Sequence, residues 1–310
     1  MLFMFPGQGS QKIGMGKDIY DAFQAARDVF HEVDEAISFK LSDLIFNGTE
    51  AELKATENAQ PALMTVSMAF VKCLEKEFSF NLTEKAKFFA GHSLGEYTAL
   101  CAAGVLSLSD TAKILRIRGK AMADACPHGG AMAAIIGLPY DVVKEIVEST
   151  SSAEAIVQIA NDNSNGQVVV SGHESAVKIA VEKATAAKAK MAVMLEVSGP
   201  FHSPLMEKAV KPMEDALAQV KFGTPSKPII ANVTAKGETD GFKQLLIKQI
   251  TNQVRWRESI MFAESAGVST CVEVGNGKVL TGLVKRTAAN LGTINVNSAE
   301  SLEKFATENA

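Results

Sequence analysis

The chain has 310 residues, of which 47% are hydrophobic and 21% are charged, and its formal net charge is −4. A chain of this length can build a large core and predicts about two domains. The negative charge offers no general attraction to nucleic acid or to an anionic membrane, so we expect neither as a partner. No apolar run approaches the length of a membrane span, and the first residues lack the basic and long apolar regions of a signal peptide.

Four cysteines are spread along the chain without a C-x-x-C pair. Two of them, Cys73 and Cys101, stand inside apolar helical patterns, which is typical of buried thiols and not of metal ligands or disulfides. We therefore predict no metal site. Free thiols, together with the missing signal peptide, favour a cytoplasmic location.

Short apolar runs alternate with long helical patterns over residues 1–125. The expected elements are a strand at 2–5, helices at 18–37 and 58–78, a strand at 86–90, and a helix that Ser109 caps and that ends near 124. A glycine-rich turn at 6–11 follows the first strand. This alternation predicts an α/β layer built on a mostly parallel sheet.

The pentapeptide Gly91-His92-Ser93-Leu94-Gly95 follows the expected strand at 86–90 and precedes a helix that we expect to begin at Leu94. This is the G-x-S-x-G pattern, in which a sharp strand-to-helix turn projects a serine Oγ from the sheet. Its two glycines suit places where a side chain would collide with the neighbouring strand and helix. Serine needs such geometry, a base and an oxyanion site to act as a nucleophile, so Ser93 is the candidate nucleophile.

Residues 128–198 follow a different order, β-α-β-β-α-β, which is the split pattern of ferredoxin-like units. The expected strands are 131–138, 155–160, 167–171 and 191–197, and the expected helices are 140–148 and 174–187. Segments rich in glycine and proline at 127–130 and 198–200 flank this unit and suit hinges.

The α/β alternation resumes after Pro200, with a helix from 204, a strand at 229–232, a helix at 242–252 and a strand at 270–274. The expected fold class is therefore α/β. It comprises an α/β-hydrolase-like parallel-sheet core, formed by 1–127 and 199–310, and a ferredoxin-like (split βαβ) subdomain inserted at 128–198. A cleft between the two is the expected ligand site.

The chain contains five histidines, and His202 is the strongest candidate for the base. His31 lies among charged helical residues, and His128 and His173 lie in turns, so these three suit the surface. His92 adjoins the candidate nucleophile on an extended strand, which points its side chain away from the serine. His202 stands in a rigid, proline-bracketed loop that can hold an imidazole near the serine.

Two glycine-rich loops bear on nucleotide binding. The turn at 6–11 fails the G-x-G-x-x-G pattern because Lys12 stands at the third glycine position, and the loop at 275–279 lacks the first glycine and the Ser/Thr of a Walker A motif. We therefore expect no nucleotide and no cofactor. Gln8 is better suited to offering its backbone N–H to an oxyanion, with the N–H of Leu94 as the second donor.

Arg118 lies on the apolar face of its expected helix, in line with Ile114, Leu115 and Met122. A guanidinium in that position is costly unless an anion pairs with it. Two partners are open: an Asp or Glu elsewhere in the chain, or a substrate carboxylate held by the bidentate fork.

An α/β-hydrolase places an acid between its serine and its histidine and carries an HGGG-type loop early in the chain. This chain has no HGGG loop and no obviously placed acid between Ser93 and His202. We therefore predict a Ser–His dyad whose imidazole is oriented by something other than a carboxylate. A serine esterase or thioesterase and a non-catalytic binding module stay as alternatives.

Six motifs follow one another along nearly the whole chain. They are Phe5-Pro6-Gly7-Gln8-Gly9-Ser10-Gln11, Gln60-Pro61-Ala62, Gly91-His92-Ser93-Leu94-Gly95-Glu96-Tyr97, Arg118-Gly119, Gly199-Pro200-Phe201-His202 and Glu273-Val274-Gly275. Together they resemble the malonyl-CoA:acyl-carrier-protein transacylases, the stand-alone acyltransferases of bacterial fatty-acid synthesis. The resemblance implies transfer of a malonyl group from malonyl-CoA to the pantetheine thiol of holo acyl carrier protein, through a malonyl-serine intermediate, to supply the elongation unit.

The resemblance also implies roles for five residues at the reacting centre. Ser93 and His202 would form the catalytic dyad, and the backbone carbonyl of Gln249 would orient the imidazole. Gln8 and Leu94 would supply the oxyanion hole.

For the substrate, the resemblance implies that Arg118 binds the malonyl carboxylate and that Asn161 faces the cleft. Phe201 is bulky beside the histidine, so we expect it to limit α-branching of the acyl group. We expect a monomer that docks the acidic carrier protein through local cations, with Lys188, Lys190, Lys278, Lys285 and Arg286 as candidates.

The chain departs from the family pattern at Asn165, Gln253 and Asn276, where the family commonly has proline. Proline stiffens loops, so these positions leave the rigidity of three loops open.

Overall fold

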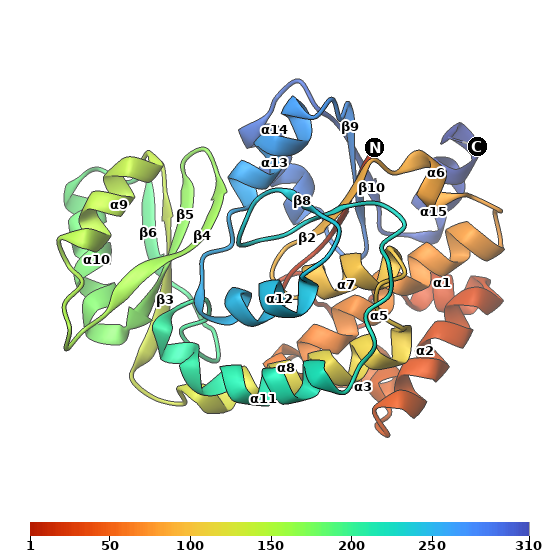
Figure 1. Ribbon diagram of the computed structural model, residues 1–310, viewed down its shortest axis with the longest axis horizontal. Helices are drawn as coiled ribbons and strands as arrows, with labels where there is room; N and C mark the ends of the chain where they lie inside the picture. Colours follow the sequence, from red (N-terminus) through yellow and green to blue (C-terminus); the bar gives the residue numbers. More distant parts are fainter. Residues whose placement is uncertain (310) are drawn as a thin grey trace.

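The computed structural model describes residues 1–309, and within them two β-sheets organise the chain (Figure 1). The larger sheet has the strand order β10-β9-β1-β2-β7-β8 and is parallel except for β8, which runs antiparallel to β7. Its strands are β1 (Leu2–Phe5), β2 (Phe88–Gly91), β7 (Ile229–Ile230), β8 (Gly237–Glu238), β9 (Thr270–Val274) and β10 (Gly292–Val296). The smaller sheet lies at the end of the molecule opposite the two chain termini (Figure 1).

Helices cover both faces of the larger sheet. Before the smaller sheet they are α1 (Lys17–Ala22), α2 (Gln24–Ala36), α3 (Leu41–Asn47), α4 (Glu50–Lys54), α5 (Thr56–Lys76), α6 (Leu82–Lys85), α7 (Gly95–Ala102) and α8 (Leu108–Ala125). After it come a 3₁₀ turn (Pro204–Met206), α11 (Glu207–Ala218), α12 (Phe242–Thr251), α13 (Trp256–Ser265), α14 (Val279–Thr287) and α15 (Ala299–Asn309). Because of this double cover, β1 is a continuous apolar run: Phe3 and Phe5 enter one core, while Leu2 and Met4 enter another.

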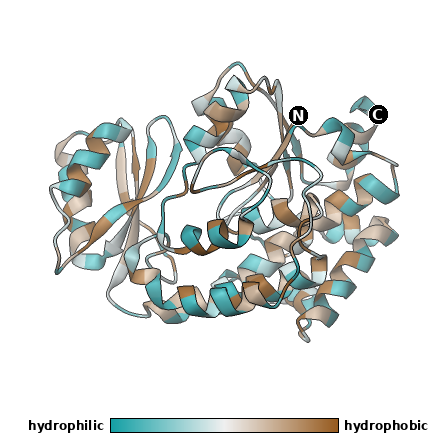
Figure 2. Cartoon of the chain, viewed as in Figure 1, coloured by the Kyte–Doolittle hydropathy of each residue, from teal (hydrophilic) through white to brown (hydrophobic). Residues whose placement is uncertain are grey.

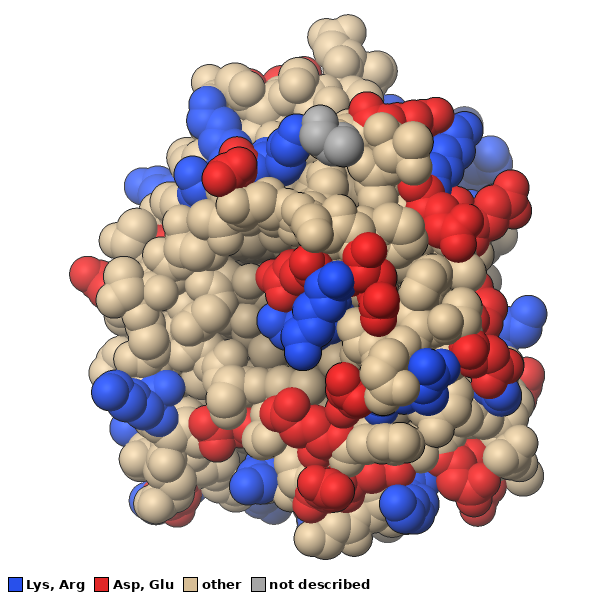
Figure 3. Space-filling model, turned by 90° about the vertical axis from the view of Figure 1, so that its right-hand side faces the viewer, with Lys and Arg blue, Asp and Glu red and all other residues tan. Residues whose placement is uncertain are grey.

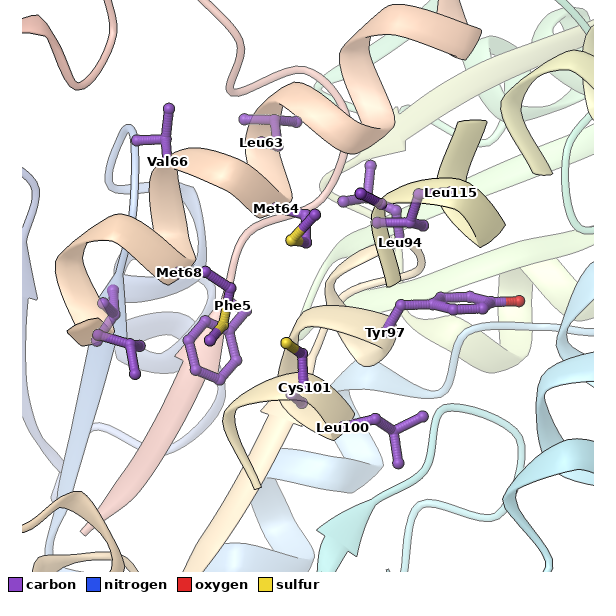
Figure 4. Close-up of a cluster of buried hydrophobic side chains, with 14 of the residues drawn as sticks. Phe5, Leu63, Met64, Val66, Met68, Leu94, Tyr97, Leu100, Cys101 and Leu115 are labelled. Carbon is purple, nitrogen blue, oxygen red and sulfur yellow. The ribbon is translucent and has the colours of Figure 1, made fainter. Parts of the chain in front are cut away.

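Helix α5, with 21 residues, is buried along most of its length and lies in the middle of the larger hydrophobic core, the one that Phe3 and Phe5 enter. Figure 4 shows part of this core, which gathers side chains from β1, α5, α7 and α8 around Met64 and Leu94. Gly119 lets α8 approach the start of α5 closely, because a Cβ at that position would lie 2.4 Å from the Cα of Glu57. This close approach brings the adjacent Arg118 to the N-terminal turn of α5.

The smaller sheet is antiparallel, with the order β4-β5-β3-β6. Its elements are β3 (Gly130–Ile136), α9 (Tyr140–Glu148), β4 (Val157–Ser164), β5 (Gln167–His173), α10 (Glu174–Ala186) and β6 (Met191–Met194). The two helices and the sheet enclose a separate apolar cluster that includes Val143, Val170 and Val177. The edge strand β4 also makes a parallel bridge between Asn161 and Val254, which joins the smaller sheet to the core.

Several expected element boundaries differ in the structure, including the following four. The helix expected at 18–37 breaks at Phe23, whose backbone is extended, into α1 and α2. The cap of α8 is Ser107, which accepts the Asp110 N–H, so the helix begins before Ser109. The helix after the serine begins at Gly95, with Leu94 as its N-cap. Strand β4 runs on to Ser164, beyond the expected end at 160, because its pairing with β5 continues through two register shifts.

Hydropathy follows this layering, since the outward sides of the helices are mostly hydrophilic and the strands mostly hydrophobic (Figure 2). Between Met1 and Asn309, no helix is both long and apolar enough to cross a membrane. Cys73, Cys101 and Cys271 are buried, as the sequence predicts for free thiols, whereas Cys126 is only partly buried.

Candidate active site

The turn at Ser93 is a tight corner between β2 and α7. Ser93 has a left-handed backbone with φ of 53°. A Cβ on Gly91 would lie 1.8 Å from the Gly95 carbonyl oxygen, and a Cβ on Gly95 would lie 2.3 Å from the Phe5 carbonyl oxygen. Both positions therefore require glycine, as the motif predicts, and the corner holds the serine at the end of its strand.

Ser93 and His202 lie within hydrogen-bond distance of each other. The Ser93 Oγ is 2.8 Å from the His202 Nε2, and the His202 Nδ1 is 2.9 Å from the backbone oxygen of Gln249. A carbonyl oxygen only accepts, so Nδ1 carries the proton and Nε2 is free to accept one from the serine. Burial, together with the nearby Arg118 cation, lowers the pKa of His202 to about 3, so the imidazole is neutral near pH 7.

Arg118 is buried, with 1% of its surface exposed, and it lies beside Ser93. Its Nη1 donates to the Gln60 Oε1 at 2.7 Å, and its Nη2 donates to the Gln249 Oε1 at 2.9 Å and to the Ser93 Oγ at 3.2 Å. The guanidinium carbon lies 5.3 Å from the centre of the Tyr97 ring. Among residues 1–309 no carboxylate forms an ion pair with Arg118, and its Nε has no hydrogen-bond partner. The hydrogen-bond partners in the protein are two neutral amides and the Ser93 hydroxyl, so the charge of the cation is left for an external anion.

A buried polar cluster beneath the serine fixes the corner. The side chain of Asn232 accepts the Ser93 N–H at 2.8 Å and donates to the Gly91 carbonyl at 2.7 Å. Glu96 accepts the Asn232 N–H at 3.1 Å and the Gln249 side-chain amide at 2.7 Å. Burial raises the pKa of Glu96 to about 7, while its two hydrogen-bond donors and Arg118 act in the other direction. The Gln249 side chain thereby links Glu96 to Arg118.

The expected oxyanion donors lie at neighbouring strand ends. Strands β1 and β2 pair in parallel with Phe5 opposite Gly91, so the loop with Gln8 and the corner with Leu94 leave the sheet side by side. Throughout the described chain, neither the Gln8 N–H nor the Leu94 N–H donates to a protein acceptor. Two free N–H groups beside a serine are what a developing oxyanion needs.

Two other expected site residues make no hydrogen bond with the reacting groups. Asn161 lies in β4 and pairs through its backbone with Val254. Phe201 is buried in the larger hydrophobic core, next to the histidine in sequence. The side chain of His92 contacts Asn163 at 2.8 Å, away from the serine, as predicted for a strand neighbour.

Sequence reasoning assigned no role to several residues that the structure brings to the site. Gln158 of the smaller sheet donates to the backbone oxygens of His202 and Thr251, at 2.6 and 3.0 Å. Asn232 follows β7, which lies next to β2, the strand that precedes the serine. A polar residue directly after β7 is the local signal that could have identified Asn232 as a site residue. Gln60 stands in a recognised motif, whereas nothing local marks Gln158.

A cavity of about 400 Å³ opens beside Gln8 and leads outward between α4 and the segment that follows β6. Its other lining residues are Ala51, Lys54, Ala55, Glu196, Val197 and Ser198. Lys54 and Glu196 form an ion pair of 2.9 Å across this gap. In the part of the chain that the structure describes, no group of three or more His, Cys, Asp or Glu side chains could hold a metal ion.

Comparisons with known proteins agree along nearly the full length. The acyl transferase domain family model matches residues 2–308. The malonyl CoA-acyl carrier protein transacylase of Bacillus subtilis (strain 168) is 46% identical over 304 residues, which cover 97% of this chain and 94% of that protein. A crystal structure of acyl-carrier-protein-S-malonyltransferase from Bartonella henselae is 51% identical, with a TM-score of 0.96 and coverage of 99% of this chain and 98% of that one. A malonyl-transacylase solved in complex with a type II PKS acyl-carrier protein is 37% identical, with a TM-score of 0.94 and coverage of 99% of both chains.

The hydrogen-bonded pair of Ser93 and the buried His202 stands beside an arginine that only neutral groups contact. The matches to known proteins extend over nearly all of the chain. The chain belongs to the acyl transferase family and, within it, to the malonyl CoA-acyl carrier protein transacylases.

Proposed function

We propose that the protein transfers a malonyl group from malonyl-CoA to the pantetheine thiol of holo acyl carrier protein through a malonyl-serine intermediate. The position of Arg118 carries this proposal, because its Nη2 lies 3.2 Å from the Ser93 Oγ and no carboxylate of residues 1–309 pairs with it. A cation so close to the nucleophile suits a short acyl group that ends in a carboxylate. The names of the similar proteins, transacylases and malonyltransferases, support the same substrate.

In the first half-reaction, the Nε2 of His202 takes the proton of the Ser93 hydroxyl as the Oγ attacks the thioester carbonyl of malonyl-CoA. The N–H groups of Gln8 and Leu94 stabilise the oxyanion, and loss of one such donor typically costs on the order of 10²- to 10³-fold in rate. Collapse breaks the C–S bond. The imidazolium returns its proton to the CoA thiolate, and malonyl-serine is left.

In the second half-reaction, the pantetheine thiol gives its proton to His202 and attacks the ester carbonyl. The same oxyanion forms, and the Ser93 Oγ leaves and regains the proton. Because CoA departs before the carrier reacts, ping-pong kinetics follow. The backbone oxygen of Gln249 holds the imidazole in the required tautomer in both steps, the role that a carboxylate has in a catalytic triad.

Arg118 also links substrate choice to the base. Its positive charge helps to lower the pKa of His202. A carboxylate bound to Arg118 neutralises that charge, so the imidazole becomes a stronger base when malonyl is present. Acetyl-CoA leaves the cation unpaired and gives no such gain.

Asn161 and Phe201 are proposed to shape the acyl and pantetheine side of the site. Phe201 is buried next to His202, so an α-methyl group has little room there. We expect methylmalonyl-CoA to be a poor donor, and equal kcat/KM values for malonyl-CoA and methylmalonyl-CoA would contradict this role.

We also propose that the chain forms an α/β-hydrolase-like core of 1–127 and 199–310 with a ferredoxin-like subdomain at 128–198. The strand order β4-β5-β3-β6, with α9 and α10 packed against this sheet, supports the proposal. A monomer is proposed as the active form, because Ser93, Arg118, His202 and Gln249 already form one hydrogen-bonded group within a single chain.

The test is intact-protein mass spectrometry after mixing with malonyl-CoA, comparing wild type with the Ser93→Ala variant. A gain of one malonyl unit in the wild type alone is the expected result, followed by its loss when holo carrier protein is added. Release of CoA and free malonate without carrier acylation would instead identify a thioesterase.

A further inference from the structure

A chain of hydrogen bonds leads from Arg118 to the oxyanion loop and passes through Thr56. The Arg118 Nη1 donates to the Gln60 Oε1 at 2.7 Å, and the Gln60 Nε2 donates to the Thr56 Oγ1 at 3.1 Å. The Thr56 hydroxyl then donates to the Gln8 Oε1 at 2.7 Å. The two ends of this chain are the proposed carboxylate site and the proposed oxyanion donor.

The chain is directional. Because the Gln60 Oε1 faces the arginine, its amide nitrogen must face Thr56. Because the Thr56 oxygen accepts from that nitrogen, its one proton is left for Gln8. Each donor therefore points away from Arg118, and bonds arranged in this way polarise one another in a buried setting.

The inner members are shielded from water. Thr56 is 2% exposed, and Gln60 and Arg118 are each 1% exposed, while Gln8 is half-buried beside the cavity. Thr56 is the first residue of α5, at the place where the absent side chain of Gly119 lets α8 come near. Its hydroxyl is thus held at a fixed position between the two helices and the loop.

We infer that Thr56 is a positioning residue that couples binding of an acyl carboxylate at Arg118 to the placement of Gln8, whose N–H faces the oxyanion. The inference rests on the proposed function. When a carboxylate engages the guanidinium, the arginine is fixed and the hydrogen-bond chain holds the loop at Gln8. An acetyl group leaves Arg118 without its anion, so the loop gains no such support.

The experiment uses three variants of the full chain. Thr56→Val removes the hydroxyl at nearly constant shape, and Thr56→Ser keeps the hydroxyl. Thr65→Val is the matched control, since Thr65 is also buried in α5 but donates only to the Pro61 carbonyl of its own helix. The values of kcat and KM are measured for malonyl-CoA and acetyl-CoA on the same preparation of each variant.

We expect Thr56→Val to lower the ratio of kcat/KM for malonyl-CoA to kcat/KM for acetyl-CoA by about tenfold, with a higher KM for malonyl-CoA and a lower kcat. Thr56→Ser and Thr65→Val should keep the ratio within about twofold of the wild type. The ratio does not depend on the fraction of folded enzyme, so partial unfolding of Thr56→Val would not mimic the effect.

Equal losses with both donors, or a Thr65→Val ratio that falls as far as that of Thr56→Val, would overturn the inference. Measurements on the wild type distinguish failure of this inference from failure of the proposed function. A wild type that transfers no malonyl contradicts the function, whereas a wild type that prefers malonyl and an unchanged ratio in Thr56→Val contradict only the role of Thr56.

Discussion

Ser93 and His202 both have left-handed backbones, with φ of 53° and 57°, and they form the 2.8 Å contact of the candidate active site. Such conformations are unfavourable for residues with a side chain and persist only where the surroundings enforce them. Here Asn232 holds the serine corner, and Gln158 holds the carbonyl of the histidine. The strain of both residues is therefore supported by hydrogen bonds from other segments.

The sequence marks those candidate site residues that have local signatures and gives no signal for residues whose contacts depend on distant partners. Ser93 stands in a recognisable turn, and His202 follows from the contexts of the other histidines. Thr56 and Gln158 are ordinary in their own segments, and their partners Gln8 and His202 are far along the chain. No local pattern records such pairs.

Arg118→Ala should lower kcat/KM for malonyl-CoA by at least about 100-fold, because the bidentate anchor for the carboxylate is lost. Acetyl transfer should gain relative to malonyl transfer. Removal of the positive charge should also raise the pKa of His202, so the acid limb of acetyl transfer should move to higher pH than in the wild type. Steady-state kinetics with both donors from pH 4 to 8 measure this, and an unchanged donor preference would contradict the role of Arg118.

Glu96 should make stability fall as pH rises from about 4.5 to about 7. Burial raises its pKa to about 7, so the folded protein keeps a proton that the unfolded chain, with a pKa near 4.5, has released. Relative to Glu96→Gln, the free energy of unfolding of the wild type should decrease by on the order of 2 kcal/mol over that range. Urea unfolding followed by Trp256 fluorescence measures both proteins.

His202 acts in the opposite direction, because its lowered pKa makes stability fall as pH drops below 6.5. It is present in both proteins, so it cancels in the comparison. A difference between wild type and Glu96→Gln that stays constant across the range would contradict the burial of a protonated Glu96.

At the scale of single elements, local patterns succeed where an element is self-contained. Helix α9 at Tyr140–Glu148 and strand β9 at Thr270–Val274 have the bounds that the sequence predicts. Strand β4 runs beyond its predicted end, and at Asn161 it bridges to Val254, a contact that no local signal marks. Predicted boundaries thus fail mainly where tertiary contacts set them.

Asn165, Gln253 and Asn276, whose loops the sequence left open in rigidity, each make a side-chain hydrogen bond. Asn165 donates to the Arg286 carbonyl at 3.1 Å, Asn276 donates to the Ser10 carbonyl, and Gln253 accepts from the Tyr140 hydroxyl at 3.4 Å. Asn276 thereby links the loop after β9 to the loop after β1. The sequence left the rigidity of these loops open, and the structure shows bonds that restrain them.

Gly119→Ala should destabilise the protein by about 1–3 kcal/mol, because its Cβ would lie 2.4 Å from the Glu57 Cα and 2.6 Å from the Thr56 carbonyl oxygen. These are backbone atoms, which cannot rotate away as the end of a side chain can, so α5 and α8 must move apart. Gly282→Ala in α14 is the control, since only the end of the Arg286 side chain lies near its Cβ, and it should stabilise by up to about 1 kcal/mol. Urea unfolding of both variants measures the effects, and equal shifts would contradict the close packing of the two helices.

At the scale of the whole molecule, the distribution of surface charge bears on docking of the carrier protein. On the face at the end away from the smaller sheet, acidic and basic side chains are interspersed (Figure 3). The five cations proposed for carrier docking are all exposed. Arg286 lies in α14, and the other four are lysines: Lys188 and Lys190 between α10 and β6, Lys278 at the N-cap of α14 and Lys285 within it. Arg286 differs from them, because it donates to Gln167 and thus joins α14 to the smaller sheet.

Charge reversal of these four lysines, one at a time, should raise KM for the acidic carrier protein by about three- to tenfold at low salt. The effect should shrink as salt is added, and KM for malonyl-CoA should change less. Lys304→Glu is the control, since Lys304 is an exposed lysine of α15, away from α14 and the smaller sheet, where it pairs with Glu308 of the same helix. If none of the four changes the KM for the carrier more than Lys304→Glu does, docking occurs elsewhere.

The two hydrogen bonds of Gln158 have a consequence for protein engineering. This residue belongs to the smaller sheet, yet it fixes backbone oxygens beside the base and at the end of α12. Exchange of the smaller sheet would therefore also change hydrogen bonds next to His202. In a chimera that takes this segment from another transacylase to accept a new carrier, the residue that contacts the His202 backbone oxygen would come from the other protein. Grafts that keep Gln158 and Asn161 should retain turnover better than grafts of the entire insertion.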